Sequence, residues 1–206
     1  GRIIGKDWKI RNIKGAFGGQ VELFTTTVYD VLDRYVEMYG RDAVIPVLRT
    51  PLGNLSMSSA QNEPELFRAM AIKGAEVILR TATGGFSPID IAATSLYNRV
   101  YTSVVNNAIS PGSPYFEDTG AGGTAVYGPD GNAIAAARSP NETLVMARIP
   151  IESFRATHRQ PTMHPALYRD VMDAYVAPYP PGLYTPYQPD TLEDAARYLK
   201  DKRVWK

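Results

Sequence analysis

The segment Pro64–Arg80, which reads PELFRAMAIKGAEVILR, decides the fold class. Apolar residues recur three and four positions apart after Pro64, and this spacing predicts a helix over residues 65–73. Gly74 is a stop signal, and the apolar run at residues 76–80 then predicts a strand with a buried centre. A helix followed at once by a buried strand is typical of folds in which helices pack on a sheet.

The same pattern repeats further along the chain. Ser87, Pro88 and Asp90 supply a capping hydroxyl, a proline at the first helical position and an acid in the first turn, so they predict a helix that runs to about Arg99. Residues 101–105 then predict another strand. This alternation of helix and strand predicts an α/β fold.

Further elements are predicted on both sides of this alternation. They are strand ends at residues 3–4 and 8–10, a helix at 28–39, a strand at 44–48, a hairpin at 124–137, a strand at 143–149, a helix at 151–159, a short amphipathic helix at 166–175 and a final helix capped by Thr191.

A segment rich in proline and tyrosine, residues 177–189, precedes the final helix. Such a segment is extended and cannot form a core by itself. Two interpretations stay open: a surface linker, or an arm that lies over a partner subunit, because tyrosine supplies a large contact area at interfaces.

The composition is that of an ordinary globular chain. Of 206 residues, 44% are hydrophobic and 21% are charged, and 22 Lys and Arg balance 21 Asp and Glu. We therefore expect no nucleic-acid partner, and no membrane partner, because basic residues form no run and no apolar stretch approaches the roughly 20 residues that span a bilayer.

The chain contains no cysteine. This excludes disulfides, thiolate metal sites, iron–sulfur clusters and thiol nucleophiles. His158 and His164 are six residues apart, a spacing that does not indicate a zinc pair. We expect no metal and no cofactor. The lack of cysteine does not fix the compartment, since exported proteins without bridges exist, and we expect a cytoplasmic protein.

The order of several motifs resembles the carbon–nitrogen hydrolase family, the nitrilase and amidase superfamily, over roughly residues 3–159. The matching pieces are GRIIGKDWKI at 1–10, TPLGNL at 50–55, PELFR at 64–68 followed by KGAEV at 73–77, Asn98 with Tyr101 and Asn106, the hairpin at 123–137, and the closing residues 147–159. The run through PELFR and KGAEV is the most specific of them. This order of motifs is strong evidence for a common fold and weaker evidence for a common chemistry.

The resemblance implies the α-β-β-α sandwich of that family, here without its first strands and helix. It also implies two domains: residues 1–160 as the carboxyl-terminal part of a hydrolase-like domain, and residues 161–206 as a helix, the proline- and tyrosine-rich arm and a final helix. Because a sheet without its opening strands exposes unpaired edges, we expect other material to complete it.

Family members hydrolyse amides or nitriles with a glutamate, a lysine and a cysteine, in which the thiolate attacks, the carboxylate moves protons and the ammonium stabilises the developing negative charge. The resemblance places Lys9 at the lysine position, although a solvated lysine at a strand end is the alternative. Glu22 is a candidate for a second glutamate of the family. Its alternative is an ordinary glutamate at the surface or at a strand edge. Asn106 is a candidate substrate contact, and its alternative role is to satisfy local backbone groups.

Ser58 stands where the family has its nucleophilic cysteine. Three interpretations compete: an engineered Cys→Ser change, a natural loss of catalysis, and a serine activated by a carboxylate from elsewhere. The neighbouring Ser59, Ala60 and Gln61 also depart from the family pattern, which a single engineered change would not explain. We therefore favour a divergent branch that lost or changed its chemistry.

Glu65 and Arg68 open the helix of the most specific motif. A carboxylate is favoured in the first turn of a helix, and Arg68 is one turn away, so we expect the two to pair and to stabilise the helix rather than to contact substrate.

The predicted function is that of a hydrolase-family protein for non-peptide carbon–nitrogen bonds of an amide or nitrile, with impaired or altered catalysis. The alternatives are an inactive structural or regulatory subunit and a small-molecule binding module. In each case we expect a homo-oligomer with the carboxyl-terminal arm at its interface.

Overall fold

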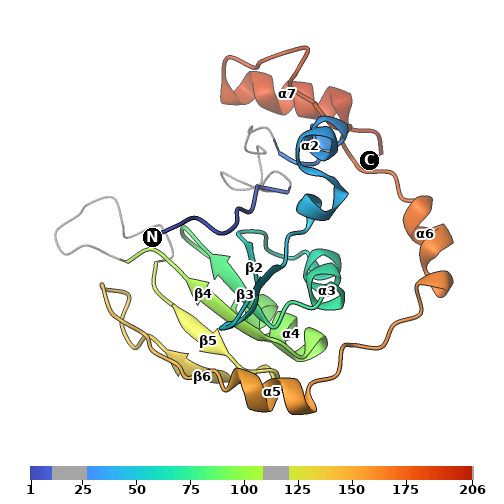
Figure 1. The fold of residues 1–206 in the computed structure, drawn as a ribbon. Helices are drawn as coiled ribbons and strands as arrows, with labels where there is room; N and C mark the ends of the chain where they lie inside the picture. Colours follow the sequence, from blue (N-terminus) through green and yellow to red (C-terminus); the bar gives the residue numbers. More distant parts are fainter. Residues whose placement is uncertain (11–26, 109–120, 206) are drawn as a thin grey trace. The chain divides into compact units, whose positions relative to one another are not determined.

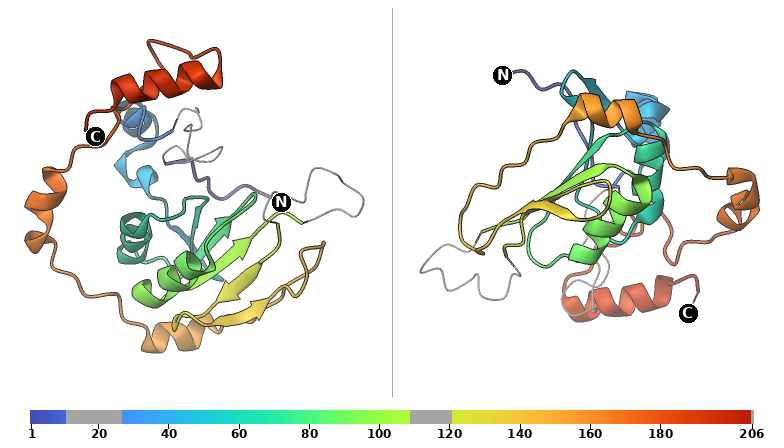
Figure 2. Two further views of the ribbon diagram at one scale, coloured as in Figure 1. Left: turned by 180° about the vertical axis from the view of Figure 1, so that it is seen from behind. Right: turned by 90° about the horizontal axis from the view of Figure 1, so that it is seen from below.

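A computed structural model describes residues 1–10, 27–108 and 121–205 of the chain. These residues form two compact units (Figures 1 and 2). The sheet unit consists of Gly1–Asp7 and Ile45–Pro161, and the helical unit consists of Trp8–Val44 and Thr162–Lys206. The helical unit thus combines two segments that are far apart in the sequence.

The sheet unit is built on one six-stranded sheet in which the spatial order of the strands equals their order in the sequence. The strands are β1 (Leu48–Thr50), β2 (Gly53–Ser58), β3 (Val77–Thr81), β4 (Tyr101–Val105), β5 (Ala125–Tyr127) and β6 (Ala133–Ala136). Strands β2, β3 and β4 run parallel, and the remaining neighbours pair antiparallel. The β1–β2 and β5–β6 pairs follow short turns, whereas each parallel pair is joined by a helix.

The two crossover helices are α3 (Pro64–Ile72) and α4 (Pro88–Asn98), which pack side by side against the sheet (Figure 2). Both begin with proline at the first position, where no backbone N–H is needed. The Ser87 hydroxyl accepts a hydrogen bond from the Asp90 N–H at 3.3 Å, which confirms the predicted cap. Arg99 adopts the left-handed conformation, with φ of 55°, and ends α4.

Apolar side chains cover both faces of the sheet. On the face of α4, Ile91, Val104 and Ala125 form a buried cluster. On the opposite face, Val77 and Tyr101 pack against Phe154 and other residues of α5 (Ile151–Thr157). Burying a large apolar side chain contributes roughly 1.5–3 kcal/mol, so these two layers hold the sheet between its helices.

The helical unit contains α2 (Leu32–Tyr39), the 3₁₀ turns η1 (Arg41–Val44) and η2 (Pro165–Leu167), α6 (Arg169–Asp173) and α7 (Leu192–Lys202). Its first segment is held by aromatic packing of Trp8 on Tyr35 and Tyr39. The two segments are joined by hydrogen bonds, because Tyr29 Oη donates to the Tyr179 carbonyl at 3.1 Å and the Gly182 N–H donates to Asp30 Oδ1 at 2.9 Å.

The arm at residues 177–189 packs on the final helix of its own chain. Tyr179, Leu183 and Tyr184 surround the buried Ala195 and Leu199 of α7. Thr191 caps that helix as predicted, since its hydroxyl accepts from the Asp194 N–H at 3.1 Å. A role of the arm at a subunit interface stays a prediction.

Three predictions of secondary structure are wrong. The strand expected at residues 44–48 begins only at Leu48, because Pro46 cannot donate to a ladder and residues 41–44 close a 3₁₀ turn. Residues 143–149 join no ladder, and their Leu144 and Met146 side chains are exposed. The helix expected at 166–175 is split into η2 and α6, where every residue is exposed, so no core stabilises a longer helix.

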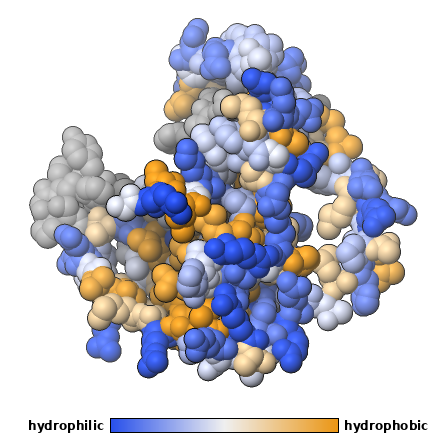
Figure 3. All heavy atoms as spheres, in the orientation of Figure 1, coloured by the Kyte–Doolittle hydropathy of each residue, from blue (hydrophilic) through white to orange (hydrophobic). Residues whose placement is uncertain are grey.

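Residues 1–10 contain no strand in the structure, so the expected strand ends are also wrong. On the face seen in Figure 3, apolar side chains also lie on the surface over the sheet unit. None of the helices in the described part of the chain has the length and apolar character required to cross a membrane.

Candidate active site

The carboxyl ends of the three parallel strands lie at one edge of the sheet. Ser58 is the last residue of β2, Arg80 is its partner in register on β3, and Asn106 follows the end of β4. Ligands of α/β sheets usually bind at this edge, where the loops after parallel strands converge. The sheet therefore brings two predicted site residues, Ser58 and Asn106, to the edge where a site is expected.

Ser58 is buried, with 5% of its surface exposed. Its Oγ accepts a hydrogen bond from the Ala60 N–H at 3.1 Å, a local turn of the kind that serine often forms. Within the described ranges, no carboxylate or imidazole is hydrogen-bonded to this oxygen. A serine hydroxyl without an adjacent base is a weak nucleophile, so the observed contacts do not activate Ser58.

Arg80 is a buried cation beside Ser58, with 2% of its surface exposed. Its Nη2 donates to the Ala60 carbonyl and, at 2.7 Å, to Asp90 Oδ2, while Nη1 lies 3.3 Å from Thr94 Oγ1. The guanidinium also lies 4.2 Å from the centre of the Phe67 ring. Burial lowers the pKa of Arg80, and the hydrogen bond to Asp90 opposes this, so the group stays charged.

Arg80 is not among the site residues predicted from the sequence, although its position carries a signal. Arg80 follows the apolar residues of a buried strand, and a charge there requires a partner. Asp90 stands in the first turn of the next helix, which packs on the same face, and was interpreted only as a helix-start residue.

The loop after Ser58 is joined to the loop before α4. Gln61 Nε2 donates to the Gly85 carbonyl, and the Ser87 N–H donates to Gln61 Oε1, both at 3.3 Å. These bonds connect the two loops that follow β2 and β3.

Asn106 and Asn107 hold the loops after β3 and β4. The Asn106 side chain donates to the Gly122 carbonyl at 2.8 Å, and Asn107 Oδ1 accepts from the Gly84 N–H at 2.7 Å. The local backbone role foreseen as the alternative for Asn106 is thus observed. A contact between Asn106 and substrate stays a prediction.

The other two predicted catalytic residues cannot be placed against Ser58. Lys9 is half-buried in the helical unit, where its carbonyl accepts from the Val28 N–H at 2.9 Å. Glu22 lies outside the described residues. The catalytic roles of Lys9, Ser58 and Glu22 therefore stay predictions.

Glu65 and Arg68 do not form the predicted pair: their side chains share no ion pair in the described part of the chain, and Arg68 Nη1 is buried there without a hydrogen-bond partner. The acid of this motif that does form an ion pair is Glu76. Its two carboxylate oxygens accept from Arg155 Nε and Nη2, each at 2.7 Å, and Oε2 also accepts from the Asn54 N–H at 2.6 Å. The hydrogen bond from Arg155 lowers the pKa of Glu76.

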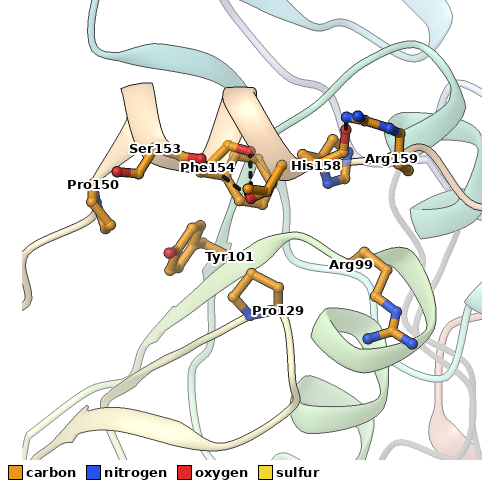
Figure 4. Close-up of a pocket in the computed structure, with 9 residues that line it drawn as sticks. Arg99, Tyr101, Pro129, Pro150, Ser153, Phe154, His158 and Arg159 are labelled. Carbon is orange, nitrogen blue, oxygen red and sulfur yellow. Dashed lines mark hydrogen bonds between the residues drawn. The ribbon is translucent and has the colours of Figure 1, made fainter.

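A hollow of about 500 Å³ lies near the amino end of β4, at the opposite end of the parallel strands from Ser58. Tyr101 and Pro129 face it from the sheet, while Phe154 and His158 of the α5 segment face it from the other side (Figure 4). The His158 ring stacks on Phe154 with centroids 4.4 Å apart, and burial lowers the pKa of His158. None of the predicted site residues lines this hollow.

In the described ranges, no group of three or more histidine, aspartate or glutamate side chains is placed to hold a metal ion. The polar side chains at the sheet edge are the Ser58 hydroxyl, the amides of Gln61, Asn106 and Asn107, and the ion pair of Arg80 with Asp90.

Comparison with protein families gives one match: the carbon–nitrogen hydrolase family, over residues 3–159. A search of curated proteins gives no significant match.

Among solved structures, Nit3 of Saccharomyces cerevisiae, a member of branch 10 of the nitrilase superfamily, aligns with a TM-score of 0.53 and 21% identity over 76% of this chain and 53% of that chain. A carbon–nitrogen hydrolase from Helicobacter pylori G27 aligns with a TM-score of 0.48 and 22% identity over 63% and 53%. A variant of the amidase from Nesterenkonia sp. AN1 in complex with butyramide aligns with a TM-score of 0.47 and 23% identity over 61% and 47%. This chain spans about half the length of these relatives.

Proposed function

Because the chain belongs to the carbon–nitrogen hydrolase family, we propose that it carries a site for amides or nitriles in which catalysis is impaired or altered. The observation behind this proposal is the state of Ser58, which ends β2, is buried and, among the described residues, hydrogen-bonds only to a local backbone N–H. The structural likeness to Nit3 supports the fold on which this proposal is built.

Hydrolysis of an amide adds water and releases ammonia and a carboxylate. In the proposed site, Ser58 Oγ would attack the substrate carbon as its proton passes to a base, and the Ala60 N–H would stabilise negative charge on Oγ until the new bond forms. For an amide, the carbon–nitrogen bond then breaks, ammonia leaves, and water hydrolyses the acyl-serine ester to release the carboxylate. A base must accept that proton. The contacts of Ser58 supply none, so turnover would be slow unless Glu22 or another carboxylate reaches it. Lys9 is proposed to stabilise the oxyanion.

The alternative is a subunit without turnover, which binds a small amide or nitrile or serves a structural or regulatory role. The same bond from Ala60 favours it, because a serine that completes a turn has a structural reason to be there. The two functions differ in what a thiol at position 58 would do.

The variant S58C tests the proposal. A thiolate is a much stronger nucleophile, so S58C is expected to release ammonia from short amides or nitriles faster than the unmodified chain and than S58A. The matched control is S56C, which places a thiol on the same strand two residues earlier and at a similarly buried position. If S58C and S56C both remain inactive while the substrates still raise the melting temperature, the binding alternative is favoured.

A homo-oligomer with residues 177–189 at its interface is part of the same proposal. Exposed aromatic area on the arm, such as Tyr187 at 43%, supports it. Removing residues 177–206 is expected to reduce the size of the oligomer on a sizing column. An unchanged elution position would remove the arm from the interface.

A further inference from the structure

Ala60 connects Ser58 to the buried arginine. Its N–H donates to Ser58 Oγ at 3.1 Å, and its carbonyl accepts from Arg80 Nη2. Both hydrogen bonds are therefore made by the backbone of Ala60. The two groups belong to neighbouring peptide units that meet at the Ala60 Cα, so a guanidinium that holds the carbonyl restricts where the N–H can lie relative to the side chain at position 58.

Arg80 is fixed by contacts with both crossover helices. Asp90 and Thr94 of α4 hold its nitrogens at 2.7 and 3.3 Å, and the Phe67 ring of α3 lies 4.2 Å from its guanidinium carbon. A guanidinium with 2% exposure and this many partners has a single arrangement available to it. A residue that served only to fill space would not need a buried charge, which is costly to desolvate.

We infer that Arg80 is a positioning residue that, through Ala60, holds a backbone N–H against the side chain at position 58 and so favours a negative charge there. This inference rests on the proposed function, which makes position 58 the nucleophile site. A backbone N–H aimed at an oxyanion or thiolate forms a charge-assisted hydrogen bond, which is about twice as strong as a neutral one. The buried guanidinium adds an attractive positive charge.

Other charged groups lie on the elements around this position. Glu63, Glu65 and Arg68 stand at the start of α3, and Asp90 stands on α4. Of these and Arg80, within the described residues, Arg80 alone is hydrogen-bonded to Ala60. The effect of Arg80 can therefore be separated from theirs by changing Arg80 itself.

The test uses the absence of cysteine from the chain, because S58C then introduces a single thiol. The pKa of that thiol is measured from the pH dependence of its alkylation by iodoacetamide. R80M is then added to S58C, because methionine keeps an unbranched apolar side chain over Phe67. The double variant is expected to have a thiol pKa about 1 higher than S58C alone. This is the lower end of the effect of a nearby opposite charge.

The variant R80K separates positioning from charge. A lysine keeps the positive charge, but its single ammonium cannot reproduce the planar fork that reaches Ala60, Asp90 and Thr94 together. Positioning predicts that R80K also raises the thiol pKa, by less than R80M does because the lysine keeps the positive charge. A thiol pKa that stays low in R80K would overturn the positioning role.

The matched control is S56C with and without R80M, where no change in thiol pKa is expected, because Ser56 bonds to the Pro46 carbonyl instead. An equal rise in S56C, or no rise in S58C, would also overturn the inference. Circular dichroism checks that each variant is folded. If R80M does not fold, T94V replaces it in the test. T94V removes one hydrogen bond to Arg80 and is expected to raise the thiol pKa of S58C by a smaller amount. The thiol pKa needs no turnover, so an inactive S58C would contradict the proposed function and leave this result standing.

Discussion

The two ends of the parallel strands each carry one ion pair between an arginine and an acid, but the roles of strand and helix are exchanged. At the carboxyl edge the strand supplies Arg80, with 2% side-chain exposure, and the helix supplies Asp90, with 14%. At the amino edge Glu76, the residue immediately before β3, supplies the acid, with 9% side-chain exposure, and the α5 helix supplies Arg155, with 42%.

This exchange shows how burial determines the partners that a charge needs. The deeply buried guanidinium requires an acid, a backbone carbonyl, a hydroxyl and an aromatic ring. The carboxylate at the other end needs only a fork-shaped arginine and one N–H, because Arg155 remains partly in water. Breaking the pair near Ser58 should therefore cost more stability, and the pair near the hollow should respond more to solvent conditions.

The largest effect is expected from D90N. Removing the acid leaves the buried Arg80 without its counter-ion, which should lower the free energy of unfolding by about 3 kcal/mol. Denaturation in urea, followed by circular dichroism, measures the change. A loss below that of E76Q would contradict the comparison between the two ends.

A smaller loss is expected from E76Q. The amide can still accept one bond from Arg155, and Arg155 can turn to water, so the free energy of unfolding should fall by about 1–2 kcal/mol. The same urea denaturation applies. E152Q is a suitable control, because Glu152 is an exposed acid on the same helix as Arg155, and it should have little effect.

The pH dependence of stability sharpens the comparison further. The pKa of Glu76 is lower in the folded than in the unfolded chain, so its contribution is present above the unfolded pKa and is lost as pH falls through the folded pKa. E76Q should therefore lose less stability than the unmodified chain between about pH 5 and pH 3. Melting temperatures across this range measure the difference, and parallel curves for the two proteins would argue against a lowered pKa.

The smallest effect is expected from H158F. Burial lowers the folded pKa of His158, so protonation opposes folding as pH falls below the unfolded value of about 6.5. Phenylalanine preserves the stacking on Phe154 and cannot be protonated. H158F should reduce the loss of melting temperature between about pH 7 and pH 5 by a few degrees, and a loss as steep as that of the unmodified chain would show that His158 does not contribute.

The sequence predicted the elements whose signals are local and failed where partners are distant. The α3–β3–α4–β4 alternation followed from Pro64, Ser87 and the apolar periodicity, and all four elements are present. The strand expected at 143–149 had suitable residues, but a strand also requires a neighbour to pair with, which its own residues do not specify.

The candidate site shows the same limit. Ser58 and Asn106 were found because they occupy recognisable motifs and ends of strands. Arg80 and the Glu76–Arg155 pair were missed, because the latter joins residues 79 positions apart in the sequence. The resemblance to a family also directed attention to residues that match the known chemistry, and Arg80 lies outside the motifs that were matched.

The helical unit has a consequence for the order of folding. Its two segments meet through hydrogen bonds that span 150 and 152 residues of sequence. During synthesis on the ribosome, residues 27–44 emerge long before their partners at 179–182, whereas the sheet unit can pair its neighbouring strands as they appear. Closing so long a loop is slow, and we expect the sheet to be complete while Tyr29 and Asp30 still await their partners in the carboxyl-terminal segment.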